Sequence, residues 1–395
     1  MASQNDSLQW PFFEEAHRRL ATEVRDWCRT NLAKAAHPGD RGGVDARCRE
    51  LVVALGRAGL LKHCLRAADG GASAEFDARS ICILRESLAW WDGLADFVFA
   101  MQGLGSAPLS LAGSDALRAR YLPRVAKGTA IAAFALSEPD AGSDVAAMQA
   151  SAQRDGATYR LNGSKTWISN GGIADFYCVF ARTEAAKSQP DGSVSAEGIS
   201  AFVVEPGDPG FSVAERIDAM APHPLARISL ADCRIPAERL IGAEGNGFKI
   251  AMRTLDVFRA SVAAAACGFA RRALDEALKH VLERSLFGRK LAEFQLTQAA
   301  LAEMATGIEA AQLLTYRAAW LRDRGDRFTA AAAMAKLTAT ETAQSVIDRS
   351  LQMFGGRGVV QGETVERLYR EIRALRIYEG ASEVQKLIIG RELLK

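Results

Sequence analysis

The feature that most constrains the fold is a change in the spacing of apolar residues, which occurs twice along the 395-residue chain. Up to residue 127, apolar side chains recur at steps of three and four, which is typical of one face of a helix. In residues 128–240 the step becomes two, and runs rich in β-branched and aromatic residues alternate with Asp-Gly and Pro-Gly turns, which predicts strands. Helical spacing then continues through residues 241–395. We therefore predict a mainly α fold in three domains: N-terminal helical (1–127), middle β (128–240) and C-terminal helical (241–395).

Alanine-rich stretches suggest how the C-terminal helices pack. Residues 263–266 and 330–335 are almost entirely alanine, and such small side chains let helices approach closely. A four-helix bundle is the simplest assembly for this segment. A chain of this length is also long for one domain, which fits several packed units with sizeable cores.

Charge and cysteine usage exclude several classes of function. The 49 basic residues nearly balance the 47 acidic ones and form no basic stripe, so nucleic acid and anionic membranes are poor candidates as partners. The chain has no apolar run of about 18 residues, and its start lacks the pattern of a signal peptide, so we expect a cytoplasmic protein. The seven cysteines form no CxxC pair and no ligand spacing with histidine, which predicts reduced thiols and no metal site.

Two glycine-rich segments resemble phosphate-binding loops only superficially. Gly242, Gly245 and Gly247 form one, and residues 355–358 form the other. Neither has the G-x-G-x-x-G spacing after a strand of a βαβ unit, and neither is followed by a Walker lysine. A nicotinamide or ATP site of the usual kind is therefore not expected.

Glu379 stands at a predicted break between two helices. Apolar residues recur at helical steps before it: Val365, Leu368, Tyr369, Ile372 and Leu375. After it, Ser382 and Gln385 have the spacing of a capping box that opens a second helix. A carboxylate between Tyr378 and Gly380 at such a break can enter an apolar pocket, where desolvation raises its pKa towards that of a general base. A solvated turn glutamate is the alternative interpretation of this tripeptide by itself.

Four motifs in a fixed order decide between these interpretations. They read AFALSEPDAGSD (residues 133–144), LNGSKTWISNGG (161–172), QMFGGRG (352–358) and IYEGASEVQ (377–385). Together they resemble the acyl-CoA dehydrogenase family of flavoproteins, over nearly the whole chain. The resemblance implies a small β-barrel as the middle domain, and FAD held without a Rossmann fold. It also implies α,β-dehydrogenation of an acyl-CoA to the trans-2-enoyl-CoA, with Glu379 as base and flavin N5 as hydride acceptor.

The resemblance also implies which residues contact FAD. Ser137 and Ser169 would lie at the polar edge and near N5 of the flavin ring, whereas Arg284 and the segment from Gln352 would reach the ADP half of a neighbouring subunit's cofactor. The full set of matching positions is Phe134, Leu136, Ser137, Ser143, Trp167, Ser169, Arg284, Phe287, Gln295, Gln352, Gly355, Gly356, Ala381 and Glu383.

The thioester site is implied in the same way. Positions that match substrate contacts of the family are Ser143, Asp256, Arg259 and Gly380. Some branches of the family carry the base on the helix that includes Asp256 and Arg259. Here that position is Phe258, which cannot accept a proton, so the base is expected to be Glu379.

The resemblance further implies an electron-transferring flavoprotein as acceptor and a homotetramer built as a dimer of dimers. Three alternatives remain: a flavin oxidase or monooxygenase on the same fold, a dehydrogenase of a carrier-protein thioester, and a flavin-bearing scaffold without activity. Arg66 to Asp69 and the segment 221–227 depart from the family pattern near the expected mouth of the substrate channel. The acyl group is therefore not assigned.

Overall fold

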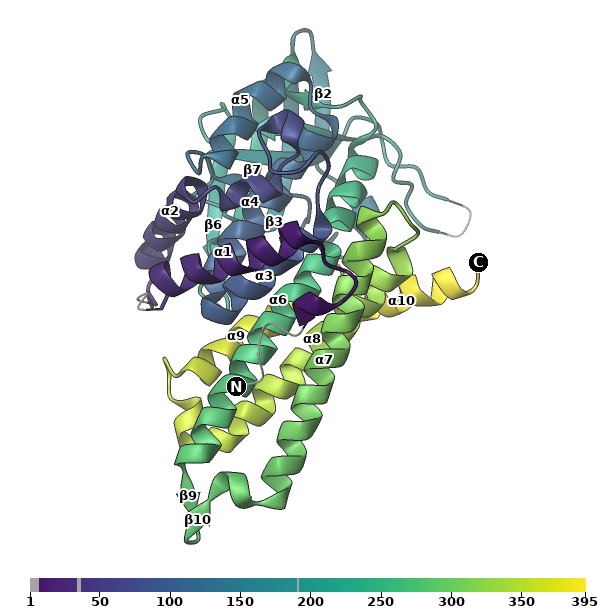
Figure 1. Cartoon of the computed structure of the whole chain (residues 1–395). Helices are drawn as coiled ribbons and strands as arrows, with labels where there is room; N and C mark the ends of the chain where they lie inside the picture. Colours follow the sequence, from purple (N-terminus) through teal and green to yellow (C-terminus); the bar gives the residue numbers. More distant parts are fainter. Residues whose placement is uncertain (1–6, 34–36, 190–191) are drawn as a thin grey trace. The chain divides into compact units, whose positions relative to one another are not determined.

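The structure, a computed structural model, describes residues 7–33, 37–189 and 192–395. It divides into two compact units. Unit 1 comprises Met1–Ala35, Asp77–Asp96 and Phe258–Lys395, and unit 2 comprises Ala36–Phe76 and Phe97–Val257. Helices precede and follow a central set of strands (Figure 1), so the predicted class, mainly α with a β domain in the middle, is confirmed.

The strands of unit 2 form one sheet. Their order is β6-β7-β3-β2-β4-β5-β8, and β1 pairs in parallel with β4. Over the described residues this ladder is an open path, so its closure into a barrel stays a prediction. The strands are β1 (Ala132–Ala135), β2 (Ser151–Asp155), β3 (Thr158–Ser169), β4 (Phe176–Arg182), β5 (Ile199–Val204), β6 (Phe211–Ile217), β7 (Leu225–Pro236) and β8 (Leu240–Ile241).

Helices of unit 2 fix the edge of this sheet. Its helices are α2 (Arg41–Arg57), most of α4 (Gly93–Ala112), α5 (Asp115–Ala126) and the first part of α6 (Gly247–Glu283). Gln102 of α4 is fully buried, donates to the Ala130 carbonyl at 2.8 Å and accepts from the Ala132 N–H at 2.9 Å. Because these backbone groups have no strand partner at this edge, the amide satisfies them and holds the start of β1.

Unit 1 is helical apart from one small hairpin. Its elements are α1 (Glu15–Asn31), α3 (Ala78–Trp91), the rest of α6, β9 (Ser285–Leu286), β10 (Arg289–Lys290), α7 (Gln295–Asp323), α8 (Thr329–Phe354), α9 (Thr364–Leu375) and α10 (Ser382–Leu393). Short 3₁₀ helices complete the two units: η1 (Ser7–Gln9), η2 (Leu60–Cys64), η3 (Ala67–Asp69), η4 (Val145–Ala147), η5 (Ala237–Arg239), η6 (Leu291–Glu293) and η7 (Gly355–Val359). The C-terminal helical domain is thus present, with three long helices and two short ones.

Small residues let the long helices of unit 1 approach closely, as their sequence predicts. Ala263 to Ala266 on α6 are fully buried. A Cβ added at Gly268 would lie 2.3 Å from the Glu86 carbonyl oxygen of α3, so only glycine permits this contact between the two helices. A hydrogen bond joins the same two helices: the Trp90 indole N–H of α3 donates to Asp275 of α6 at 2.8 Å.

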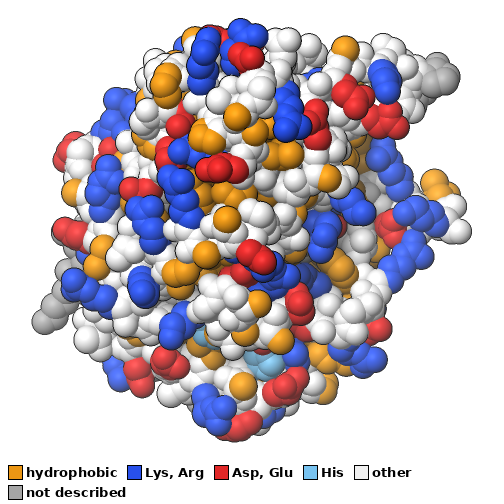
Figure 2. Space-filling model, turned by 90° about the horizontal axis from the view of Figure 1, so that it is seen from above, with side chains coloured by type: hydrophobic (Ala, Val, Ile, Leu, Met, Phe, Trp, Pro, Cys, Tyr) orange, Lys and Arg blue, Asp and Glu red, His pale blue; other side chains and the backbone are white. Residues whose placement is uncertain are grey.

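The surface carries mixed charge. Figure 2 shows lysine and arginine side chains interspersed with aspartate and glutamate on the face in view, without an extended area of one sign among the coloured residues. Within the described residues, no helix is both long and apolar enough to cross a membrane.

Candidate functional site

Glu379 lies in the turn between α9 and α10, in an unusual backbone conformation. Its φ is +52° and that of Gly380 is +88°, so two consecutive residues are left-handed. Glycine adopts this conformation freely, but a glutamate does so only where the surroundings hold it. The backbone N–H of Glu379 makes no hydrogen bond to another group of the described residues. The turn therefore presents both a strained residue and an available backbone donor.

The carboxyl group of Glu379 is desolvated, although part of the residue remains exposed. Its Oε2 atom is buried and has no hydrogen-bond partner within the described chain. Burial raises the pKa of this carboxyl, while the positive charges of Arg85, Lys336 and Arg259 oppose that rise. Burial outweighs the three cations, so the group is a stronger base than a solvated glutamate.

The helix after this turn begins where expected, but the predicted capping box is wrong. Ala381 is the N-cap, and no side chain caps it. The Ser382 hydroxyl instead donates to Glu341 of α8 at 2.5 Å, and the Gln385 amide donates to the Gly380 carbonyl at 2.9 Å. Tertiary partners thus replace the local ones that the spacing suggested.

Unit 2 brings two of the sequence motifs side by side. The Thr166 N–H donates to the Ser137 carbonyl at 3.0 Å, so residues 134–137 run next to the end of β3. A β-bulge between Lys165 and Ile168 breaks the pairing with β7 and places Trp167 at φ +58°, with 62% of its surface exposed. The bulge therefore holds a large aromatic side chain out of the core.

The other residues of these two motifs differ in burial. Leu136 is buried and its carbonyl accepts from the Lys165 ammonium at 3.0 Å, whereas Phe134, Ser137 and Ser169 are half-buried. Ser143 is exposed, in the turn that follows.

A second group of motif residues gathers at one end of the helices of unit 1. The rings of His280 on α6 and Phe354 on α8 stack with centroids 4.2 Å apart, which joins the segment of Arg284 to that of Gln352. Phe287, at the tip of the β9–β10 hairpin, is left-handed and 94% exposed. Arg284, Gln295, Gln352, Gly355 and Gly356 are exposed too. A cavity of about 320 Å³ adjoins this segment, lined by Asp348, Leu351, Val359, Glu366, Tyr369 and Arg370.

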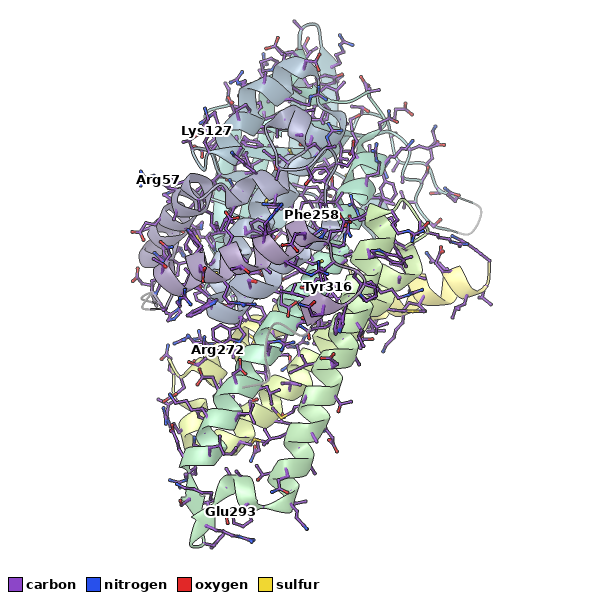
Figure 3. The ribbon with its side chains drawn as sticks, in the orientation of Figure 1. Arg57, Lys127, Phe258, Arg272, Glu293 and Tyr316 are labelled. Carbon is purple, nitrogen blue, oxygen red and sulfur yellow. The ribbon has the colours of Figure 1, made fainter. Side chains whose placement is uncertain are left out.

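Apart from Ser143, which belongs to unit 2, the proposed substrate residues lie on α6 and in the turn of Glu379. Phe258, which occupies the alternative position for a base, is buried in unit 1 (Figure 3). Arg259 follows it and is close enough to both Glu379 and Lys336 to shift the pKa of each. Asp256 is half-buried on the part of α6 in unit 2, Gly380 and Ala381 are half-buried in the turn, and Glu383 is exposed on α10.

Three buried charged residues near Glu379 were missed from the sequence. Arg85 of α3 and Asp96 at the start of α4 form an ion pair with two hydrogen bonds of 2.9 and 2.8 Å, and Lys336 of α8 is 1% exposed. Arg85 is the single cation of the run ICILRES, and Lys336 that of the run AAAAMAKLTA. A single cation in such a run is the signal that would have found them.

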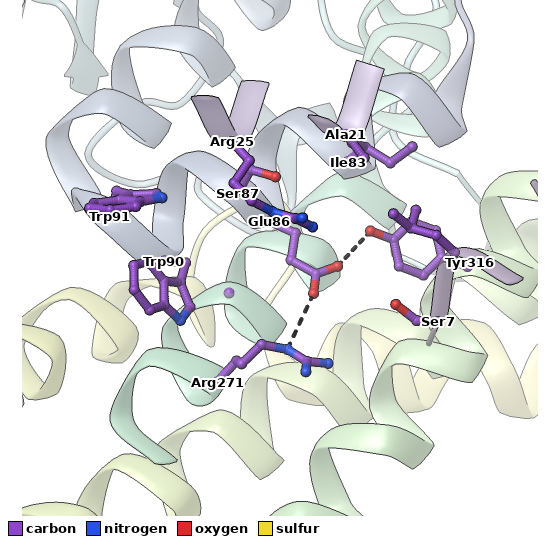
Figure 4. Close-up of a pocket in the computed structure, with 12 residues that line it drawn as sticks. Ser7, Ala21, Arg25, Ile83, Glu86, Ser87, Trp90, Trp91, Arg271 and Tyr316 are labelled. Atoms are coloured by element: carbon purple, nitrogen blue, oxygen red, sulfur yellow. Dashed lines mark hydrogen bonds and ion pairs between the residues drawn. The ribbon is translucent and has the colours of Figure 1, made fainter. Parts of the chain in front are cut away.

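A further cavity in unit 1 does not belong to this site. It holds about 50 Å³ and is lined by apolar side chains such as Ile83 and Trp91 together with the polar groups of Glu86, Arg271 and Tyr316 (Figure 4). Glu86 accepts from the Tyr316 hydroxyl at 2.5 Å and pairs with Arg271 at 3.9 Å. Among the residues that line it, none belongs to the four sequence motifs.

Comparison with known proteins places this geometry in a family. Three family models match in order: Acyl-CoA dehydrogenase, N-terminal domain (residues 14–129), middle domain (133–233) and C-terminal domain (245–394). Cyclohexane-1-carbonyl-CoA dehydrogenase of Geobacter metallireducens is 37% identical over 381 residues, which cover 95% of this chain and 97% of the relative.

Solved structures agree. The structure of butyryl-CoA dehydrogenase from Megasphaera elsdenii has a TM-score of 0.88 and 35% identity, covering 97% of this chain and 99% of that one. One described as "Electron transferring flavoprotein of Acidaminococcus fermentans: Towards a mechanism of flavin-based electron bifurcation" has a TM-score of 0.87 and 37% identity, with the same coverage of 97% and 99%. From the matched domains, the relatives and the shared fold, we conclude that this chain belongs to the acyl-CoA dehydrogenase family.

Proposed function

We propose that Glu379 is the base in the FAD-dependent dehydrogenation of an acyl-CoA thioester by this chain. Membership of the family carries the reaction class and the cofactor. The observation that supports the base is the buried Oε2 of Glu379, which has no partner in the described chain and whose desolvation raises the pKa of the carboxyl. A base of this kind, with a pKa moved towards neutrality, suits proton abstraction from carbon.

The chain itself supplies two functions in this step. The Glu379 carboxylate takes the α-proton, and the Glu379 backbone N–H, which has no acceptor in the described residues, donates to the thioester oxygen. That hydrogen bond stabilises the negative charge that develops on the oxygen as the proton leaves, which makes the α-proton more acidic. Bound FAD would supply the acceptor for the β-hydride.

The surface of unit 2 fits one part of the flavin. We assign Phe134, Leu136, Ser137, Trp167 and Ser169 to the isoalloxazine ring. An exposed tryptophan in a strained bulge is an apolar surface that the described residues leave largely uncovered, and a flat aromatic ring is a suitable occupant. The hydroxyls of Ser137 and Ser169 supply hydrogen-bond donors for the ring's polar atoms.

The end of unit 1 that carries the β9–β10 hairpin and residues 352–356 is proposed to bind the ADP half of the cofactor. We assign Arg284, Phe287, Gln295, Gln352, Gly355 and Gly356 to the FAD of a neighbouring subunit. An arginine suits a pyrophosphate, and Cβ atoms at either glycine would meet only open space, so a ligand can approach the backbone there. This assignment requires a homo-oligomer, which we propose is a dimer of dimers.

The remaining contacts complete the proposal. We assign Ser143, Asp256, Arg259 and Gly380 to the acyl-CoA, and Ala381 and Glu383 to FAD. An electron-transferring flavoprotein is the proposed electron acceptor, because the description of a solved structure of the same fold names such a protein. A cytoplasmic location is supported by seven free, buried cysteines, which suit a reducing compartment.

Anaerobic titration of the purified flavoprotein tests the reaction. Butyryl-CoA, cyclohexane-1-carbonyl-CoA and longer acyl-CoAs are added in turn, and one or more should bleach the flavin absorbance and yield the 2-enoyl-CoA. The same acyl groups on a carrier protein form the second arm. Bleaching only by the carrier-protein thioesters would reassign the substrate. A flavin that no thioester reduces would contradict the proposal and favour an oxidase or a scaffold.

A further inference from the structure

We propose that Lys336 is a positioning residue for the reaction: it orients the Glu379 peptide so that its N–H faces the thioester oxygen. The inference rests on the proposed function of Glu379 and adds a residue to it. The contacts of one buried ammonium group carry the argument.

Lys336 contacts two carbonyl groups of the turn that carries Glu379. Its side chain extends from α8, is 1% exposed, and donates from Nζ to the Tyr378 carbonyl at 2.6 Å. The same Nζ donates to the Gly380 carbonyl. The Tyr378 carbonyl belongs to the peptide that precedes the left-handed Glu379, and the Gly380 carbonyl to the peptide between Gly380 and Ala381, so one cation holds both ends of this turn.

The position of the ammonium determines where the Glu379 N–H points. The Tyr378 carbonyl and the Glu379 N–H belong to the same peptide group, which is trans, so they point in opposite directions. Because the carbonyl is held by Lys336, the N–H is directed away from α8. The positively charged ammonium that donates to this carbonyl also polarises the peptide group and makes its N–H a stronger donor. Both effects serve an oxyanion contact.

Gln385 also supports this turn, but through other carbonyl groups than that of Tyr378. Its amide reaches the Gly380 carbonyl at 2.9 Å and, at 3.4 Å, the Glu379 carbonyl. It makes no bond to the Tyr378 carbonyl. The neutral amide therefore supports the turn, while Lys336 is the group that holds the peptide whose N–H is used.

The charges around this turn predict a pH signature. Glu379 faces the cations of Arg85 on α3, Arg259 on α6 and Lys336 on α8, and the anion of Asp96 on α4. Burial lowers the pKa of Lys336 to about 8, with Arg259 acting in the same direction and Glu379 opposing it. The cation is thus present below about pH 8 and is lost as pH rises through that value, so flavin reduction should slow on the alkaline side.

The test compares Lys336→Met and Lys336→Arg with Thr340→Val. Thr340 lies one turn further along α8, is buried, and donates to the Lys336 carbonyl, so its variant perturbs the same helix without reaching the turn. Each holoenzyme is mixed anaerobically with the best acyl-CoA between about pH 6 and pH 10. The rate of flavin reduction, the acyl-CoA dependence of that rate, FAD content and melting temperature are recorded.

Lys336→Met should reduce flavin about 100-fold more slowly at saturating acyl-CoA, the effect of losing one oriented donor, with FAD retained. Lys336→Arg should recover part of this rate and lose the alkaline decline, because arginine stays charged. Thr340→Val should keep the rate and the pH profile of the natural chain.

Two results would overturn the inference. One is a Lys336→Met rate within about threefold of the natural chain, or a loss matched by Thr340→Val. The other is an alkaline decline that persists in Lys336→Arg, which would assign it to another group such as Lys165, whose pKa burial also lowers to about 8. If Lys336→Met yields no flavoprotein, the pH profile of Lys336→Arg tests the inference by itself, through the presence or absence of the alkaline decline. Failure of the proposed function would look different, because then no acyl-CoA would reduce the flavin of the natural chain either.

Discussion

At the residue scale, the proposed base is a carboxylate held where its charge is unfavourable. The three cations near Glu379 do not offset the loss of water around it, so its pKa stays raised. Complete neutralisation by a close ion pair would have produced a weaker base. The absence of a hydrogen bond to Oε2 in the described chain is therefore consistent with its proposed function.

Glu379→Gln should abolish turnover and leave FAD bound, because the amide keeps the shape of the side chain and cannot accept a proton. The expected loss in the rate of flavin reduction is at least about 100-fold. Stopped-flow reduction by the best acyl-CoA measures it, with Glu303→Gln, an exposed carboxylate on α7, as the matched control. Retention of most of the rate would move the base elsewhere, with Asp256 and Glu383 the next candidates.

The pH dependence of the same step follows from the raised pKa of Glu379. The base works only when ionised, so the rate should fall as pH drops through this pKa, which lies above the ordinary value of 4.5. Arg259→Met removes a cation that favours the carboxylate and should move the acid side of the profile to higher pH. A shift to lower pH, or none, would show that the acid limb belongs to another group.

At the scale of elements, Asp323 joins the end of α7 to the start of α3. Its carboxylate accepts from the backbone N–H groups of Ala78 and Arg79 at 2.7 and 3.1 Å, and from the Arg79 side chain at 2.9 Å. Free N–H groups in the first turn of a helix need such a partner. The N-cap residue Asp77 accepts from the Ser80 N–H at 3.1 Å, and the rest of the cap comes from Asp323, more than 240 positions away.

Asp323→Ala should lower the free energy of unfolding by about 2–4 kcal/mol, since it removes a helix cap and leaves the half-buried Arg79 short of a partner. Asp326→Ala is the matched control. Asp326 pairs with Arg324 at an exposed position three residues later, and its loss should change stability by less than about 0.5 kcal/mol. Urea unfolding of both variants provides the comparison, and equal effects would contradict the capping role of Asp323.

At the scale of the whole molecule, one cofactor is proposed to draw on two chains. Unit 2 carries the proposed contacts to the flavin ring, and the far end of unit 1 carries those to the ADP half of a neighbour's FAD. In a twofold dimer each chain both gives and receives these contacts, so FAD binding and subunit association become linked equilibria. The exposure of Phe287, at 94%, fits a residue that is covered only in an assembly.

Arg284→Ala should weaken FAD retention and, as the flavin is lost, loosen the dimer. Trp167→Ala should change the flavin spectrum and leave assembly intact, because the proposed contact of this residue is with the flavin ring and not with the neighbouring chain. Light scattering on diluted protein, with flavin absorbance followed in parallel, measures both effects. A monomer with full FAD content would show that the segment of Gln352 has no role across subunits.

The sequence by itself determined the order of elements, the family and the turn that carries Glu379. Those properties are local: helical and strand spacing extends over a few residues, and the four motifs are contiguous. Only the tertiary structure decided which partners the polar groups choose. Ser382 bonds to Glu341 and not to its own helix, Lys336 reaches across 42 residues to Tyr378, and Thr166 binds Ser137. Such pairings depend on how elements pack, because a buried polar group takes whichever partner the surrounding backbone brings within reach.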